Sequence, residues 1–367
     1  MIYLAEWDGK KQKSWSGTTY SLLRALEKNN SISSIDININ TYTKVKYLLL
    51  SGIITGKFTR NLIFNAFYQK DREKKIIKEV QSIDSKNILQ IGDIANLNNS
   101  MIYQDLSLSF LLKIKEFDPD SFKLSGFSHF KDDELRERNE IQLERYNTAK
   151  YILTMSHSLR NHLIEDQGFN ENKVIYVGGG INVKPDEAKQ KVSKNRRNIL
   201  FVGRDFLRKG GDLTVSAFKL LKRQEEYKDL SLYIAGPKEL SDEYLGEGIH
   251  FLGDMSSKEL EEYFNICDIF CMPSRFEAYG LVFAEALTHG LPCIGLNKFD
   301  MPYFIEDGVS GYLLKSQDGA KQLSDKIDKL LRNEDIFKYV NSNLEEYRRE
   351  YSWDTVAKRI LEVSNEN

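Results

Sequence analysis

Short apolar runs rich in isoleucine, valine and tyrosine alternate along the chain with longer stretches of helical period. This alternation is typical of βα units that build a parallel sheet. It occurs twice, and it predicts an α/β fold with two Rossmann-like, doubly wound domains. In the first half we predict strands at residues 2–5, 32–39, 87–91, 101–103, 151–154 and 174–177. In the second half we predict strands at residues 198–202, 230–235, 250–252, 269–272, 292–296 and 311–314.

The length of 367 residues supports two domains, because one hydrophobic core usually serves about 100–200 residues. Residues 178–180 are glycines and precede a charged stretch that reaches residue 197. They suit a hinge, and a simple loop or helix cap is the alternative. We therefore expect domains at residues 1–183 and 184–350, followed by a C-terminal helix at residues 351–367.

Composition narrows the class of protein. Hydrophobic residues make up 41% and charged residues 29% of the chain, as in ordinary globular proteins. The formal net charge of -2 creates no field that would recruit nucleic acid, so an anion site must be built from a few placed basic residues. The N-terminal apolar run is short and soon acidic, which predicts a cytoplasmic protein. The three cysteines are expected to be buried thiols, and the five histidines show no metal-site spacing. Residues 118–120 are typical of a turn.

The strongest chemical signal lies in residues 273–286. A predicted strand ends there, Glu277 lies in the loop, and Gly280 opens a helix that carries Glu285. The backbone N–H groups of Gly280, Leu281 and Val282 would form an anion site, because a helix N-terminus presents unpaired donors and a positive dipole end. Two carboxylates beside bound phosphate suit the hydroxyl groups of a sugar or a ribose. The alternative is that Glu277 caps the helix and Glu285 faces solvent.

The second signal follows the first strand of the second half, where the sequence runs from Gly203 through Arg204 and Lys209 to Gly210. In a doubly wound sheet such loops line the ligand crevice, and glycines allow the backbone to approach a ligand closely. Both cations could stabilise the charge that grows on a departing diphosphate. The alternative is that they are surface cations without a ligand.

Together these motifs resemble the retaining glycosyltransferases of family 4, which have the GT-B fold. The pair of glutamates, the Gly-Arg and Lys-Gly steps, and residues 232–237 and 251–253 carry the resemblance. It implies two Rossmann-like domains that face a central cleft and a C-terminal helix that crosses back to the first domain. It also implies that Arg204 and Lys209 hold the donor diphosphate, that Glu285 binds the ribose, and that Glu277 lies near the reacting carbon of the sugar. The donor-binding residues expected in this way are Gly17, Gly203, Arg204, Lys209, Glu277, Tyr279, Gly280, Leu281, Val282 and Glu285.

The first domain matches the family more loosely. Gly17 lies in a loop like the one that meets donor phosphate or acceptor in the family, and an N-cap by Ser16 or Thr18 explains it equally well. Many family members carry a histidine in the middle of this domain, where this chain has Asp93 and Asp105 instead. These two aspartates are the candidates for binding the acceptor.

Residues 47–54 form an apolar run flanked by Lys44, Lys46, Lys57 and Arg60. The run is too short to span a bilayer. An apolar and basic surface over residues 44–60 could rest on a membrane, and the alternative is a core helix with a solvated face.

The resemblance implies transfer of a hexose from a UDP- or GDP-sugar to a glycan, lipid-linked or small-molecule acceptor, in the synthesis of cell-surface polysaccharide or glycoconjugate. The family retains anomeric configuration by front-face attack and needs neither metal nor cofactor beyond the nucleotide-sugar co-substrate. A sugar-nucleotide 2-epimerase of the same architecture and a non-catalytic partner subunit are the alternatives. A nicotinamide dehydrogenase is disfavoured, because no Gly-x-Gly-x-x-Gly follows a first strand in either half.

Overall fold

The computed structural model describes residues 1–8, 10–28, 30–56, 58–59, 61–84, 87–183, 185 and 196–365. The chain folds as two compact units. Unit 1 contains Met1–Pro119, Phe127–Gly180 and Trp353–Asn367, and unit 2 contains Asp120–Gly126 and Ile181–Ser352. The domain boundary predicted at residue 184 falls on a residue outside those described.

The core of unit 1 is a six-stranded sheet in the order β2-β1-β3-β4-β5-β6, in which every neighbouring pair is parallel. Its strands are β1 (Ile2–Asp8), β2 (Ser33–Ile39), β3 (Ile88–Ile91), β4 (Ser100–Gln104), β5 (Tyr151–Thr154) and β6 (Val174–Tyr176). Consecutive residues of β1 from Ile2 to Ala5 are buried. A strand covered on both faces reads as a continuous apolar run rather than an alternating one, which is why this strand could be predicted.

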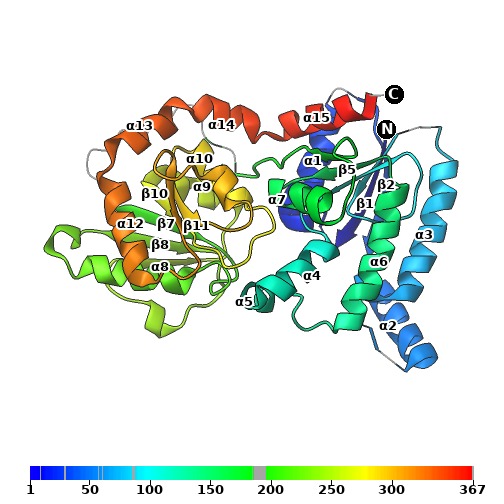
Figure 1. Ribbon diagram of the computed structural model, residues 1–367, viewed down its shortest axis with the longest axis horizontal. Helices are drawn as coiled ribbons and strands as arrows, with labels where there is room; N and C mark the ends of the chain where they lie inside the picture. The colour runs from blue at the N-terminus through cyan, green and yellow to red at the C-terminus, as the bar shows by residue number, and fades with distance from the viewer. Residues whose placement is uncertain are drawn as a thin grey trace. The chain divides into compact units, whose positions relative to one another are not determined.

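Helices complete unit 1 (Figure 1). They are α1 (Thr18–Glu27), α2 (Thr41–Thr55), α3 (Ala66–Gln81), α4 (Leu108–Phe117), α6 (Asp132–Thr148), α7 (His157–Asn161) and α15 (Trp353–Asn365). Two 3-10 helices, η1 (Lys11–Gly17) and η2 (Leu62–Phe64), and the π-helical segment η3 (His162–Asp166) accompany them. One core cluster joins Ile2 and Leu4 of β1 to Ile76 of α3. Another joins Ile152 of β5 to Tyr146 of α6.

The C-terminal helix α15 packs on helix α1 of unit 1, as Figure 1 shows. The Lys28 ammonium lies 2.6 Å from the Asp354 carboxylate, and the Asn87 amide donates to the Ser364 hydroxyl at 2.8 Å. A side chain at Gly180 would come within 2.5 Å of the Trp353 indole, so the chain passes close beneath this ring. The expected return of the C-terminal helix to the first domain is confirmed.

Unit 2 has a second parallel sheet of six strands, in the order β12-β11-β10-β7-β8-β9. Its strands are β7 (Asn198–Val202), β8 (Ser231–Ala235), β9 (Ile249–Gly253), β10 (Ile269–Cys271), β11 (Cys293–Leu296) and β12 (Gly311–Leu314). Its helices are α8 (Gly211–Lys222), α9 (Ser257–Ile266), α10 (Leu281–Thr288), α11 (Met301–Phe304), α12 (Ala320–Arg332), α13 (Glu334–Ser342) and α14 (Leu344–Glu350), with the turns η4 (Glu225–Tyr227) and η5 (Asp242–Tyr244). Each predicted strand in both halves is present, and the α/β fold class is confirmed.

The turn predicted at residues 118–120 is wrong, because Pro119–Lys123 forms the short helix α5. Proline suits the first position of a helix, where its missing N–H is not needed. Within unit 2, the Ser121 hydroxyl donates to the Arg275 carbonyl at 2.6 Å and accepts from the Lys298 ammonium at 2.8 Å.

Candidate functional site

Two loops of unit 2 meet at the carboxyl edge of its sheet. They follow β7 and β10, which are parallel neighbours, so both emerge at the same edge. The Arg275 N–H donates to the Arg208 carbonyl at 2.8 Å, and the Arg208 guanidinium donates to the Phe276 carbonyl at 2.9 Å. The Arg275 guanidinium also pairs with the Asp212 carboxylate at 2.6 and 2.9 Å. These contacts fix the loops to each other and to the start of α8.

Lys209 and Glu277 form an ion pair between these loops. The Lys209 ammonium donates to Oε2 of Glu277, and their side chains are only 13% and 11% exposed. Burial lowers the pKa of Lys209, whereas the neighbouring Glu277 carboxylate acts in the opposite direction. Removing one partner of a buried pair leaves an uncompensated charge in a poorly solvated place. The two residues that the sequence singled out separately are therefore one structural unit.

Helix α10 begins beside this pair. A side chain at Gly280 would lie 3.3 Å from Cγ of Glu277, so the carboxylate-bearing side chain reaches the helix N-terminus. Gly280 has φ of 107° and ψ of 45°, a left-handed conformation that strongly favours glycine. The first N–H groups of a helix have no partner within it, and here they belong to the turn that starts at Leu281 and Val282. A positive dipole end, an ammonium and a carboxylate thus lie together.

Tyr279 supports the start of α10 from its other side. Its ring is buried and meets the ring of Phe304 edge to face, with centroids 5.1 Å apart. The structure therefore gives Tyr279 a packing role in unit 2.

Glu285 lies on α10 and is buried. Its Oε1 accepts the backbone N–H groups of Asn182 and Val183, each at 3.1 Å. Burial raises the pKa of Glu285 to about 7, although the two N–H donors lower it. The solvated position considered as an alternative for this carboxylate is wrong, because the chain that enters unit 2 covers it.

Gly203 and Arg204 follow β7. A side chain at Gly203 would come within 2.7 Å of Cγ of Lys209, so glycine leaves room for the lysine stem. Arg204 is 77% exposed, and its Nε lies 3.3 Å from the Asp254 carboxylate. The structure thus brings Gly203, Lys209, Glu277 and Gly280 together and places the Arg204 side chain in solvent.

In unit 1, the loop before α1 has an unusual backbone. Trp15, Ser16 and Gly17 follow one another with φ of 45°, 56° and 90°. A non-glycine residue in this region costs on the order of 1–3 kcal/mol, and such strain gathers at functional sites. Gly17 is the N-cap residue of α1, and no side-chain cap accompanies it. The predicted N-cap by Ser16 or Thr18 is therefore wrong, and the strained loop remains as the notable feature.

The two candidate acceptor residues have different surroundings. Asp93 is held in a buried network, since its carboxylate accepts from the Gln142 amide at 2.9 Å and pairs with Arg138 and Arg145. Asp105 follows β4 and is partly exposed, and its backbone carbonyl accepts from the Ser156 hydroxyl at 3.5 Å. The carboxylate of Asp93 is thus occupied by structural partners.

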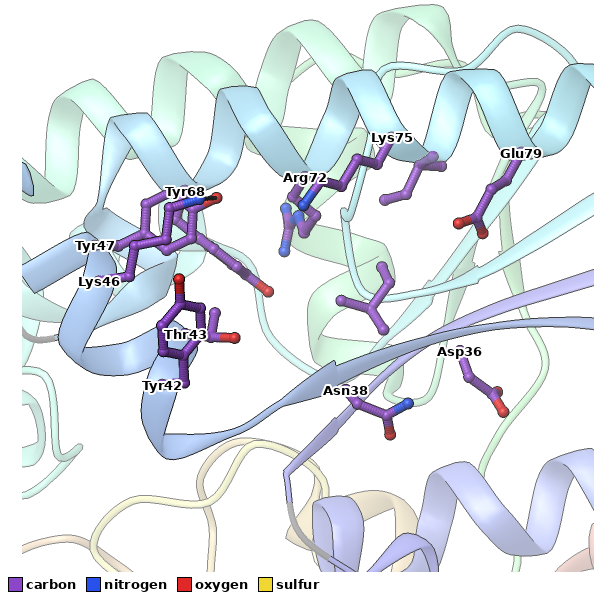
Figure 2. A pocket seen from close by; sticks show the side chains of 12 residues that line it. Asp36, Asn38, Tyr42, Thr43, Lys46, Tyr47, Tyr68, Arg72, Lys75 and Glu79 are labelled. Atoms are coloured by element: carbon purple, nitrogen blue, oxygen red, sulfur yellow. Dashed lines mark hydrogen bonds between the residues drawn. The ribbon is translucent and has the colours of Figure 1, made fainter.

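A cavity of about 220 Å³ lies in unit 1 between β2, α2 and α3 (Figure 2). Figure 2 shows Arg72, Lys75 and Glu79 on α3 opposite Asp36 and Asn38 of β2. The end of the cavity at α2 is lined by Tyr42, Thr43, Lys46 and Tyr47, with Tyr68 of α3 beside them. Sequence reasoning missed this cavity, because its charges come from separate elements that no motif connects.

Other expectations concern groups outside these sites. Among the described residues, no three histidine, cysteine or acidic side chains gather as a metal-ion cluster, and the three cysteines are buried as expected. His162 is buried between Ser109 and Asp166, at 3.0 and 2.8 Å, which fits a structural role. Within the described ranges, no helix has the length and apolar character needed to cross a bilayer.

Known proteins resemble this chain in sequence and in fold. A profile of the family described as glycosyl transferases group 1 matches residues 183–351. Residues 183–351 are thus similar to the glycosyl transferases group 1 family. The matched region contains the loops that carry Lys209, Glu277 and Gly280, so the family expected from the sequence is confirmed.

Individual known proteins match parts of the chain in sequence. A Klebsiella pneumoniae protein described as an uncharacterized 41.2 kDa protein in the cps region is 32% identical over 42% of this chain and 45% of its own length. A phosphatidyl-myo-inositol mannosyltransferase of Mycobacterium leprae is 30% identical over 52% of each chain. The chain thus spans about half the length of these curated relatives.

The fold also has solved counterparts. The crystal structure of WaaG, described as a glycosyltransferase involved in lipopolysaccharide biosynthesis, superposes with a TM-score of 0.70 over 100% of both chains at 14% identity. At this identity the likeness concerns the fold alone. The two parallel sheets with their helices and the returning C-terminal helix are those of a GT-B-like protein.

Proposed function

We propose that this protein is a retaining glycosyltransferase that moves a hexose from a nucleoside diphosphate sugar to an acceptor. The observation that carries the proposal is the buried Lys209–Glu277 pair beside the N-terminus of α10. A diphosphate needs positive charge and N–H donors, and the hydroxyl groups of a sugar need an acceptor such as a carboxylate. The match of residues 183–351 to the glycosyl transferases group 1 family supports this assignment.

In this mechanism, the Lys209 ammonium and the first N–H groups of α10 stabilise the negative charge that develops on the leaving diphosphate. Such fixed donors act without reorganising as the bond to the sugar breaks. Glu277 accepts hydrogen bonds from sugar hydroxyls and thereby orients the reacting carbon. A departing phosphate oxygen takes the acceptor's proton in front-face attack, so no protein base and no metal ion is required.

Supporting roles follow for neighbouring residues. Arg204 is exposed and its Nε lies 3.3 Å from the Asp254 carboxylate, so its guanidinium can turn toward a bound diphosphate. Glu285 binds the ribose through hydroxyl hydrogen bonds, as the family resemblance implies, while its Oε1 holds Asn182 and Val183. Gly17 lies in the strained loop of unit 1, and its proposed role is to contact donor phosphate or acceptor through the backbone.

The acceptor is proposed to bind unit 1. Its cavity combines hydroxyl, amide, carboxylate and cationic groups with tyrosine rings, a set that suits a polyhydroxylated ligand. Asp105 is the better acceptor candidate of the two aspartates, because Asp93 is already paired with arginines. The names of the relatives from a capsule region and from mannosyl transfer to a phosphoinositide favour a glycan or lipid-linked acceptor, and a place in cell-surface polysaccharide or glycoconjugate synthesis.

Incubation with donor and product analysis test this function. UDP- and GDP-hexoses are offered with glycan and lipid-linked acceptors, and the anomeric configuration of the product is read by nuclear magnetic resonance. We expect release of the nucleoside diphosphate and a product that keeps the donor's configuration. Conversion of donor to an epimer without an acceptor would assign the rival 2-epimerase activity. Nucleotide binding without any turnover would assign a non-catalytic subunit.

A further inference from the structure

Helix α2 of unit 1 presents an apolar stripe to solvent. Tyr42, Val45, Leu49 and Ile53 are all exposed, and they follow one another at intervals of three, four and four residues. This spacing places them along one face of a helix. The opposite side of α2 is anchored, because Tyr47 and Ser51 are buried. The helix therefore has a fixed orientation, and its apolar stripe faces solvent.

Three further exposed apolar side chains lie on α2 and in the segment that follows it. They are Ile54 at the end of α2, Phe58 and Ile63, and Phe58 is 64% accessible. Among the described residues, seven of the fourteen exposed large hydrophobic side chains lie between Tyr42 and Ile63. We call the residues Tyr42, Val45, Leu49, Ile53, Ile54, Phe58 and Ile63 the α2 surface. A concentration of exposed apolar side chains on one segment is typical of an interaction site, whereas single exposed residues need no explanation.

The segment that carries the α2 surface has basic residues and no acidic ones. Residues 41–65 contain no aspartate or glutamate and carry four basic residues. Lys44 and Lys46 lie on α2 and are exposed. The Lys46 ammonium lies 3.7 Å from the carboxylate of Asp71 on α3. The other two, Lys57 and Arg60, lie outside the described residues. An apolar stripe with exposed lysines on the same helix complements a layer with an apolar interior and anionic headgroups.

We propose that the α2 surface docks the protein on an anionic lipid bilayer. The apolar side chains enter the boundary between headgroups and acyl chains, and the basic side chains remain at the level of the headgroups. The exposed Lys44 and Lys46 on the helix that carries the apolar stripe favour an anionic bilayer over an uncharged apolar partner. A second copy of this chain would bring the same positive charge to the interface and would be repelled.

The docked orientation also concerns the cavity of unit 1. Tyr42 and Lys46 belong both to α2 and to the lining of the cavity, as Figure 2 shows. A polar group carried by a membrane lipid would thus meet the cavity at its α2 end. This last step rests on the proposed function, whereas docking itself requires neither donor nor turnover.

Vesicle co-sedimentation tests the docking surface in the full-length protein. The vesicles contain phosphatidylcholine alone or phosphatidylcholine mixed with phosphatidylglycerol. Ile53→Glu places a charge at the most exposed position of the stripe, which is 80% accessible. Phe117→Glu is the matched control, because Phe117 is 74% accessible in the same unit and lies outside the α2 surface.

We expect the wild-type protein to bind the anionic vesicles, Ile53→Glu to bind them at least about tenfold more weakly, and Phe117→Glu to bind like the wild type. Each basic residue near an anionic surface contributes about fivefold to binding. Lys44→Gln combined with Lys46→Gln should therefore weaken binding by at least about tenfold, and added salt should weaken the wild type. Equal melting temperatures of the variants would show that folding is not the cause.

Two results would overturn the proposal. One is a wild-type protein that stays in solution with anionic vesicles, or an Ile53→Glu variant that binds as well as the wild type. The other is a dimer in light scattering that Ile53→Glu dissociates, because a second copy would then occupy the α2 surface. Loss of vesicle binding with intact sugar transfer to a soluble acceptor would reject docking alone, and the reverse result would reject the transferase alone.

Discussion

Replacing Glu285 by glutamine should remove a pH dependence from the stability of unit 2. The carboxylate is buried on α10 and receives two N–H groups from the chain that enters the unit. Burial raises its pKa from an ordinary 4.5 to about 7. The folded state therefore holds this proton more tightly than the unfolded state does. The stabilisation that protonation provides is complete below pH 4.5 and is lost as the pH rises through 7.

The magnitude follows from linkage. A shift from 4.5 to about 7 implies that the wild-type protein loses about 2.5 kcal/mol between pH 5 and pH 8 through this group. Glutamine has the same shape, carries no charge, and keeps a carbonyl oxygen that accepts from Asn182 and Val183. Glu285→Gln should thus match the wild type closely at pH 5 and exceed its stability at pH 8.

Urea denaturation followed by circular dichroism at both pH values measures this difference. Glu262→Gln on α9 is the control, because it removes an exposed carboxylate from the same unit. The His289 ring, which lies 2.6 Å from the Glu285 backbone carbonyl, is present in all the proteins and cancels in the comparison. A stability difference between Glu285→Gln and the wild type that does not change with pH would refute the reasoning, as would a variant less stable than the wild type at pH 8.

Two further predictions concern the loops of unit 2. Lys209→Met or Glu277→Gln alone leaves a buried charge without its partner and should cost about 3–5 kcal/mol of unfolding free energy. The double variant should have a stability near that of the wild type. If the two losses measured by denaturation add up in the double variant, the pairing is contradicted. Gly210→Ala should lower the melting temperature more than Gly308→Ala, because both have positive φ but only the new methyl at Gly210 would lie 2.2 Å from the Pro273 carbonyl; equal shifts would show that the loops are not in close contact.

Much of the fold could be predicted because parallel strands are covered on both faces. Strands such as Ile269–Cys271 read as short apolar runs for this reason, and the ends of the strands were predicted within three residues. The short helix at Pro119–Lys123 was missed, since a proline between two aspartates has the composition of a turn. Local composition does not distinguish a turn from the first turn of a helix.

The site could be predicted only in part. Glycines and charges after strands pointed to the loops that carry Lys209 and Glu277, and the structure brings these two loops together. Their pairing could not be foreseen, because it depends on two strands becoming neighbours. Glu285 receives N–H groups from residues 103 and 102 positions away, and a carboxylate pattern contains no information about such donors.

Asp93 shows the same limit in unit 1. Its position after a strand suggested a ligand-binding carboxylate, yet α6 brings Arg138 and Arg145 against it. These arginines are seven residues apart and share one face of the helix, which is a signal that sequence reasoning could have used. An acidic residue after a parallel strand is a good site candidate only when no buried arginine neutralises it.

The central claim is that Lys209, which Glu277 holds in place, and the start of α10 bind the diphosphate of a sugar nucleotide. Isothermal titration calorimetry with uridine, guanosine and adenosine diphosphates tests it most directly, on the wild type and on the variant that combines Lys209→Met with Glu277→Gln. We predict that the wild type binds at least one of the three, and that the double variant binds it about tenfold to hundredfold more weakly at an unchanged melting temperature. Equal affinity of the two proteins would contradict the account.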